Sequence, residues 1–204
     1  MSWIHLDKPA LTDMIETVQT GDIAPLFTPV LSEGKWVSLP FYHQLRLYRL
    51  TSFSSMPIFS LHFLGDGTRF YYLDGTILPL LTTAQHGDLK ITAGNIIAYL
   101  NFYFFAVIQA EGEVFLVHEP GEYPFLDQTP DQFQPTFHIG PGAPTYEITA
   151  LDDGGFQVVT PLFIDGTLAR ATLLVDVMGR VTITEQRLIL PGDLPPRPDA
   201  PIYH

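Results

Sequence analysis

Histidine is the residue of this 204-residue chain best suited to proton transfer or metal binding, because imidazole changes charge near neutral pH. Seven histidines are scattered along the chain, and no two have the HxH or HExxH spacing that places a pair on one metal. They are His5, His43, His62, His86, His118, His138 and His204. We therefore predict no metal site and no cofactor. His62, His118 and Tyr71 are the candidate catalytic residues of a site assembled from distant strands.

Acidic residues gather around one long segment in the middle of the chain. They are Glu111, Glu113, Glu119, Glu122, Asp127 and Asp131. Paired carboxylates can bind calcium or hydrolyse glycosides. The chain has no calcium-loop pattern, however, so a solvated acidic rim is the better interpretation.

Several classes of chemistry are excluded by composition and by missing motifs. The chain has no cysteine, which excludes disulfides, thiolate catalysis and zinc–cysteine sites. The nucleophile elbow, the P-loop and the dinucleotide-binding glycine pattern are also absent from the sequence. No local motif therefore assigns the chain to an enzyme class.

The charge balance bears on partners and location. The net charge is −12, and the ten Lys and Arg residues are scattered, so no basic stripe is present for a nucleic-acid backbone or an anionic membrane surface. The first residues lack a basic segment followed by an apolar one, the pattern of a secretion signal. We therefore predict a cytoplasmic protein that binds no nucleic acid and no membrane.

These residues must be positioned by a scaffold, and the stretch 91–110 is its predicted centre. It has no charged residue and is predicted to be a helix capped by Thr92. Helical spacing gives it an apolar face of Ile97, Leu100, Phe104, Val107 and Ile108, with Phe104 as the expected core residue. A helix that is apolar all round is buried in protein or in lipid. The stretch just reaches the roughly 20 residues of a membrane span, but Gly94, Asn95, Asn101 and Gln109 interrupt it, so we expect burial in protein.

Period-two alternation and turn residues predict strands on both sides of this helix. In the first half we expect a short helix over 9–20, strands over 35–39 and 45–52, and a hairpin turning at Asp66-Gly67. A two-residue turn there would pair Leu64 with Arg69 and His62 with Tyr71, and Pro79 would mark an edge strand or a strand end. After a strand over 114–119, the last third reads as a meander. Its expected strands cover 145–151, 156–164, 169–176 and 180–190. A three-residue turn over 177–179, with Gly179 in left-handed geometry, would pair Val175 with Val181, Leu173 with Ile183 and Thr172 with Thr184.

Two proline-rich segments lie outside these elements. Residues 120–144 contain six prolines and form a long predicted loop, a class of connection that is usually functional or disordered. Its aromatic residues are our candidate ligand-binding set: Tyr123, Phe125, Phe133 and Phe137. The tail 191–204 is expected to be extended.

Together these features predict an α+β fold: a large bent or two-layer antiparallel sheet around one central apolar helix, with a short N-terminal helix. One domain over 1–204 is favoured, and two small β-rich domains joined at 120–144 are the alternative. We expect a soluble, non-enzymatic binding or assembly module that uses a sheet face and the 120–144 loop. Its partner would be a protein, a small apolar ligand or a second copy. The alternatives are a hydrolase or isomerase with a pocket between loop and sheet, and a membrane-associated protein that uses 91–110.

Overall fold

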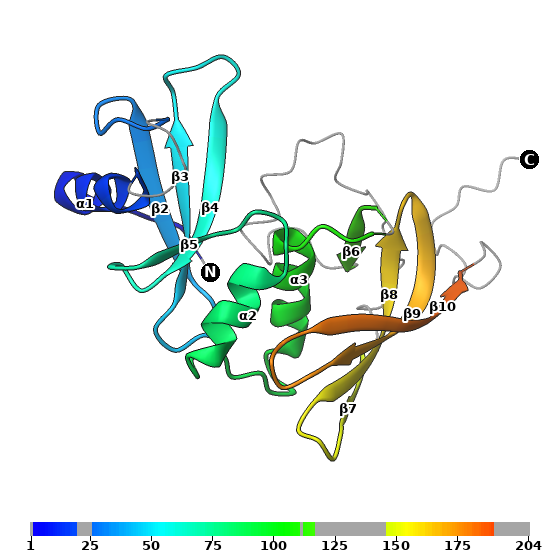
Figure 1. Cartoon of the computed structure of the whole chain (residues 1–204). Helices are drawn as coiled ribbons and strands as arrows, with labels where there is room; N and C mark the ends of the chain where they lie inside the picture. The colour runs from blue at the N-terminus through cyan, green and yellow to red at the C-terminus, as the bar shows by residue number, and fades with distance from the viewer. Residues whose placement is uncertain (1, 20–25, 111, 117–145, 190–204) are drawn as a thin grey trace, which may run out of the picture.

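A computed structural model of the chain describes residues 2–19, 26–110, 112–116 and 146–189. The described part contains three helices and two antiparallel five-stranded sheets. Two of the helices, α2 and α3, lie between the sheets, and α1 lies on the far side of the N-terminal sheet (Figure 1). The predicted α+β class with antiparallel strands is confirmed, and the strands form two separate open sheets.

The N-terminal sheet has its strands in sequence order, each antiparallel to the next. Its strands are β1 (Ile4–His5), β2 (Ser32–Ser38), β3 (Arg46–Ser52), β4 (Phe59–Gly65) and β5 (Phe70–Tyr72). Side chains alternate between its two faces. One face carries Tyr48, Leu50 and Phe63 toward α1, and the other carries Leu47 and Leu64 toward α3.

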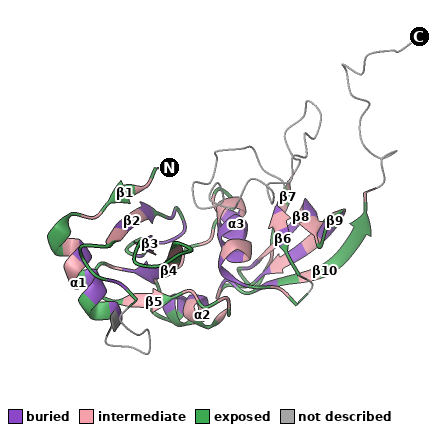
Figure 2. Ribbon diagram, turned by 90° about the horizontal axis from the view of Figure 1, so that it is seen from above, coloured by how far each residue is buried: buried purple, intermediate pink, exposed green. Residues whose placement is uncertain are grey.

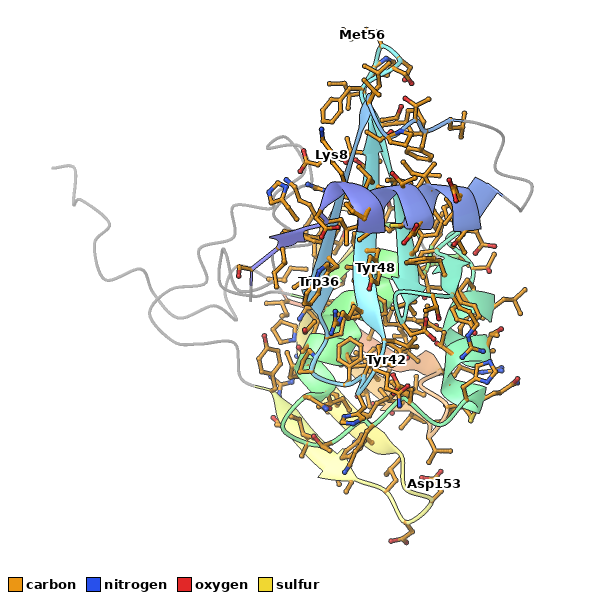
Figure 3. All side chains as sticks on the ribbon, turned by 90° about the vertical axis from the view of Figure 1, so that its left-hand side faces the viewer. Lys8, Trp36, Tyr42, Tyr48, Met56 and Asp153 are labelled. Atoms are coloured by element: carbon orange, nitrogen blue, oxygen red, sulfur yellow. The ribbon has the colours of Figure 1, made fainter. Side chains whose placement is uncertain are left out.

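Helix α1 (Lys8–Gln19) confirms the predicted N-terminal helix. Its start is fixed by Asp7, whose Oδ1 accepts a hydrogen bond from the Ala10 backbone N–H at 3.0 Å. Four apolar residues at helical spacing are buried against the sheet: Leu11, Met14, Ile15 and Val18. Figure 3 looks onto this helix, which crosses the sheet, with Met56 at one extremity of the molecule and Asp153 at the other.

The central helix α3 (Ile96–Ala106) is shorter than the predicted 91–110. At its start, the Asn95 side chain accepts from the Thr92 backbone N–H at 2.7 Å and donates to the carbonyls of Pro40 and Lys90. Thr92 therefore precedes the helix instead of capping it. At its end, Val107 is already extended and bridges to Gly75.

This early end of α3 changes which of its faces is the core. The buried side chains are Ile96, Tyr99, Leu100, Asn101, Phe102, Tyr103 and Ala106. Phe104 is only half-buried, and Ile108 is 80% exposed. Of the predicted core face, Leu100 and Val107 are buried, whereas Ile97 and Phe104 are half-buried. The expectation was wrong for Phe104 as the main core residue and for Ile108, which lies beyond the end of the helix. Figure 2 shows α3 between the sheets, and no helix among the described residues is long and apolar enough to cross a membrane.

The sequence analysis missed a second helix, α2 (Leu78–Gln85). Pro79 lies in its first turn, where the missing N–H costs no hydrogen bond. The expected strand end at Pro79 was therefore wrong. Thr83 lies on the buried side of α2. Its hydroxyl is 3.2 Å from the hydroxyl of Tyr42 and links the helix to the segment between β2 and β3.

The second sheet confirms the C-terminal meander. Its order is β10-β9-β8-β6, and β7 also pairs with β8. The strands are β6 (Val114–Leu116), β7 (Glu147–Ala150), β8 (Phe156–Ile164), β9 (Thr167–Val175) and β10 (Val181–Leu188). Val175 pairs with Val181 and Leu173 with Ile183, as predicted, but a bulge then pairs Thr172 with Glu185 instead of Thr184.

The hairpin at Asp66-Gly67 has a longer connection than predicted. Gly65 pairs with Phe70 and Leu64 with Tyr71, so the expected pairs of Leu64 with Arg69 and His62 with Tyr71 were wrong. The physical reason is Asp66, whose Oδ1 accepts from the backbone N–H groups of Thr68 and Arg69 at 2.8 Å each. These bonds, that of Arg69 first, lower the pKa of Asp66 to about 2.

The main hydrophobic core joins the two sheets through α3. It includes Val37, Leu47 and Leu64 from the N-terminal sheet and Val158, Leu162, Leu173 and Val175 from the C-terminal sheet. The sheets are therefore held by a shared core. The 120–144 loop and the 191–204 tail lie outside the described residues.

Candidate binding face

The face of the N-terminal sheet that looks toward α3 is built from cross-strand rows. Nearest the helices, Val37, Leu47 and Leu64 pair across β2, β3 and β4 and are buried. The next row outward consists of three basic residues, Lys35, Arg49 and His62. A polar row of Glu33, Thr51 and Ser60 follows. Leu31, Phe53 and Ile58 lie directly beyond the paired ends of β2, β3 and β4, and the Phe53 N–H donates to the Leu31 carbonyl at 2.8 Å. We call these three residues the apolar row. We call these three outer rows the open face.

The helices cover only the inner part of this sheet. The β3–β4 hairpin projects well beyond α2 and α3 (Figure 1). Leu31 is 48% exposed, Phe53 48% and Ile58 53%. The opposite face at the same end is covered, because Phe27 and Leu50 are buried there beside α1. The sheet thus presents one uncovered surface in which three large apolar side chains adjoin polar ones.

Charged side chains in the open face are unevenly paired. Glu33 Oε1 lies 2.6 Å from Lys35 Nζ and 3.2 Å from His5 Nδ1, as an ion pair without aligned hydrogen bonds. The Arg49 guanidinium stacks on Trp3, 5.3 Å from the ring centre. Burial lowers the pKa of Arg49, and burial followed by the charge of Arg49 lowers the pKa of Lys35.

His62 connects the open face with a shallow cleft of about 280 Å³. The cleft lies beside the Asp74-Gly75 turn and the end of α3, and its lining includes Leu73, Phe105 and Ile108. The His62 ring meets Phe105 edge-on, with 5.0 Å between ring centres. Burial, followed by the nearby charge of Arg49, lowers the pKa of His62 to about 4. His62 is therefore a neutral imidazole at pH 7.

This buried imidazole predicts an acid-sensitive stability. The pKa of His62 is about 4 in the folded protein against an ordinary 6.5, so the unfolded chain binds the proton more readily below pH 6.5. The free energy of unfolding should fall by about 2 kcal/mol between pH 7 and pH 5 through this residue. Urea denaturation of His62→Gln should lack that component, whereas an equal decrease in variant and wild type would contradict the assignment.

Comparisons with protein-family models, with curated proteins and with solved structures find no match. The function is therefore argued from the geometry of the described residues.

Among the described residues, no other predicted catalytic residue lines the cleft with His62. His62 lines the cleft, but Tyr71 pairs with Leu64, packs against the main core and has its ring centre 6.4 Å from that of His86. The other predicted site residues, His118, Tyr123, Phe125, Phe133 and Phe137, lie outside the described residues. Within the described ranges, no cluster of three or more His, Asp or Glu side chains could hold a metal ion.

The sequence analysis did not single out Arg49, Lys35 or Phe53. Arg49 and Lys35 are cross-strand partners, so only the register of β2 with β3 reveals that two cations adjoin. The signal available in the sequence was the absence of charge between Arg49 and His62. An uncharged stretch that contains a hairpin turn predicts apolar residues at the exposed end of the hairpin.

Proposed function

We propose that the protein is a non-enzymatic binding module whose open face docks a segment of a protein partner. The observation that supports this most is the apolar row, which no described element covers although the other side of the same strands is buried. Contiguous exposed apolar surface bordered by polar groups is typical of protein-interaction sites. Arg and aromatic residues, here Arg49, Trp3 and Phe53, are enriched among residues that dominate binding energy.

The partner is expected to bring an extended stretch with large apolar side chains to the apolar row. No charged residue lies between Arg49 and Asp66, so β4 and its hairpin offer nothing to repel an apolar segment. Strand β5 pairs with β4 only over residues 63–65, and the Leu73 N–H then donates to the His62 carbonyl. On this edge of β4, no described strand pairs with residues 59–61. Such an edge can accept a further strand. A second copy of the chain is one such partner.

A hydrolase or isomerase that uses His62 is the second candidate. It is favoured by the neutral imidazole at the cleft, which could accept a proton, and by Asp74 in the same lining. The Asp74 carboxylate already accepts from the Thr76 N–H and hydroxyl, at 2.9 and 2.7 Å. These hydrogen bonds show that the Asp74 carboxylate stabilises the turn, so an enzymatic function is less well supported than the binding function.

Replacing two members of the apolar row should abolish partner binding without unfolding the protein. Phe53→Ser with Ile58→Ser removes side chains that are about half-exposed, so the free energy of unfolding should fall by only about 2 kcal/mol and the protein should stay folded. A matched control is Val177→Ser with Leu188→Ser, which are 60% and 58% exposed near the C-terminal sheet. Each protein is immobilised and its bound proteins are compared after exposure to an extract of the source cells.

The expected result is one or more proteins retained by the wild type and the control variant and lost with the open-face variant. Sedimentation velocity on the same three proteins tests self-association. Equal retention and equal sedimentation of all three would contradict the proposed surface.

A further inference from the structure

Arg49 is a half-buried cation without a carboxylate partner in the described part of the chain. Its Nε is buried, and no described residue accepts a hydrogen bond from it. The ion pairs of the described residues join Glu33 with Lys35 and His5, Asp66 with Arg69, and Glu147 with Arg170. In a chain of net charge −12, a guanidinium without an acid beside it is unexpected, because buried charges are normally paired.

The neighbours of Arg49 increase the free-energy cost of this unpaired charge. Lys35 is its direct cross-strand partner on one side and His62 on the other. Like charges in directly opposite positions destabilise a sheet. Glu33 offsets the charge of Lys35, and His62 is neutral at pH 7, so one positive charge remains on this row. A single negative charge placed beside Arg49 would balance it.

We propose that Arg49 is the anchor for a carboxylate of the docked partner segment, supplied by an Asp or Glu side chain or by a chain terminus. The planar guanidinium matches the two oxygens of a carboxylate. The one remaining positive charge fits a monoanion better than a phosphate dianion. This inference rests on the proposed docking function, and it adds the chemistry that the partner must carry.

The spacing of the rows also fixes where the partner's apolar side chain lies. Arg49 lies in β3 and Phe53 directly follows this strand, four positions later, or about 13 Å at the rise of a strand. An extended segment that runs beside these strands covers the same distance between its own positions i and i+4. The structure therefore fits a partner segment with a carboxylate at one position and a large apolar side chain four positions away.

The test uses three probes with the isotope-labelled full chain. The first is a capped pentapeptide with glutamate at its first position, phenylalanine at its fifth and small polar residues between. The second has glutamine in place of glutamate, and the third is inorganic phosphate. The Nε–H resonance of Arg49 is followed by nuclear magnetic resonance. We expect a saturable shift with the glutamate peptide and at least about tenfold weaker binding of the glutamine peptide, as expected for a charge-assisted hydrogen bond.

Two variants of the same strand separate this site from general charge attraction. Arg49→Gln should weaken binding of the glutamate peptide by at least about tenfold. Arg46→Gln should leave it unchanged, because Arg46 stacks on Trp36 at 4.0 Å on the opposite face of the sheet. The wild-type comparison of glutamate and glutamine peptides needs no variant, so it remains decisive if Arg49→Gln fails to fold.

The outcomes distinguish this inference from the function on which it rests. Equal binding of the two peptides, tighter binding of phosphate, or no saturable shift would overturn the carboxylate site. If cell partners are still lost with the Phe53 and Ile58 variant, the docking function would stand without it. If the peptide binds through Arg49 but partners are retained by that variant, the carboxylate site would stand and the docking of proteins on the apolar row would fall.

Discussion

Phe102→Ala should lower the free energy of unfolding by about 3–5 kcal/mol, a large part of the roughly 5–15 kcal/mol typical of a domain. Phe102 is fully buried in α3, and its ring centre lies 5.4 Å from that of Phe41 and 6.3 Å from that of Phe105. The side chain therefore packs between the helix and the connection after β2. Truncation leaves a cavity that these rings cannot refill. Urea denaturation at neutral pH measures the change.

Phe104→Ala is the matched control because it is the same substitution in the same helix. Phe104 is half-buried, so its truncation removes less contact and opens part of the cavity to water. We expect a cost at least about 1 kcal/mol smaller than that of Phe102→Ala. Equal costs for both variants would contradict the orientation of α3 that buries Phe102 and leaves Phe104 half-buried.

Gly179→Ala should destabilise the protein by about 2–4 kcal/mol, from backbone strain and a steric clash together. Gly179 has φ +80°, in the left-handed region. A Cβ there would overlap the buried hydroxyl of Tyr99 and lie 2.8 Å from Leu89 Cδ2. The Tyr99 hydroxyl donates to the Gly179 carbonyl, so this turn of the C-terminal sheet is fastened directly to α3.

Gly166→Ala separates the two causes. Gly166 also has φ +80°, but a Cβ there would meet nothing within 4 Å. Its substitution should cost only about 1 kcal/mol, the conformational part. The difference between the two variants in thermal or urea denaturation measures the Tyr99 contact. A difference near zero would contradict the docking of this turn on α3.

The sequence was most informative where a period is repeated within one element. The spacing of Leu11, Met14, Ile15 and Val18 predicted α1, and alternation predicted β8, β9 and β10 to within a few residues. In α3 the same reasoning failed at Phe104, because almost every side chain of the helix is apolar, so the pattern does not single out the face that packs inward. It failed at Ile108 because apolar residues continue beyond the helix into an extended segment. Composition alone does not mark that end. The bridge of Val107 to Gly75 does, and it depends on a residue distant in the sequence.

Register was predictable only where a glycine fixed the turn. Gly179 in left-handed geometry set the pairing of β9 with β10 correctly as far as Ile183. At Asp66 the side chain competed with the expected two-residue turn by accepting backbone hydrogen bonds. A sequence pattern shows that such bonds can form, but not that they outweigh a tighter turn.

The candidate binding face was less accessible to sequence reasoning than the fold. His62 was singled out as a histidine, but its neighbour Arg49 lies thirteen positions earlier and meets it only through the register of β3 with β4. The exposure of Phe53 depends on where the helices stop covering the sheet. That limit is set by the lengths of α2 and α3 and by their packing, which are properties of the assembled structure.

Site-specific cross-linking from the open face tests the central claim most directly. The photoreactive phenylalanine analogue p-benzoylphenylalanine is placed at Phe53 and, as a control, at Val177, which is also exposed. Both proteins are irradiated in an extract of the source cells, and the adducts are identified by mass spectrometry. The proposed docking surface predicts a defined adduct, with a protein partner or a second copy, from position 53 and none from position 177. The same adducts from both positions, or none from position 53, would contradict it.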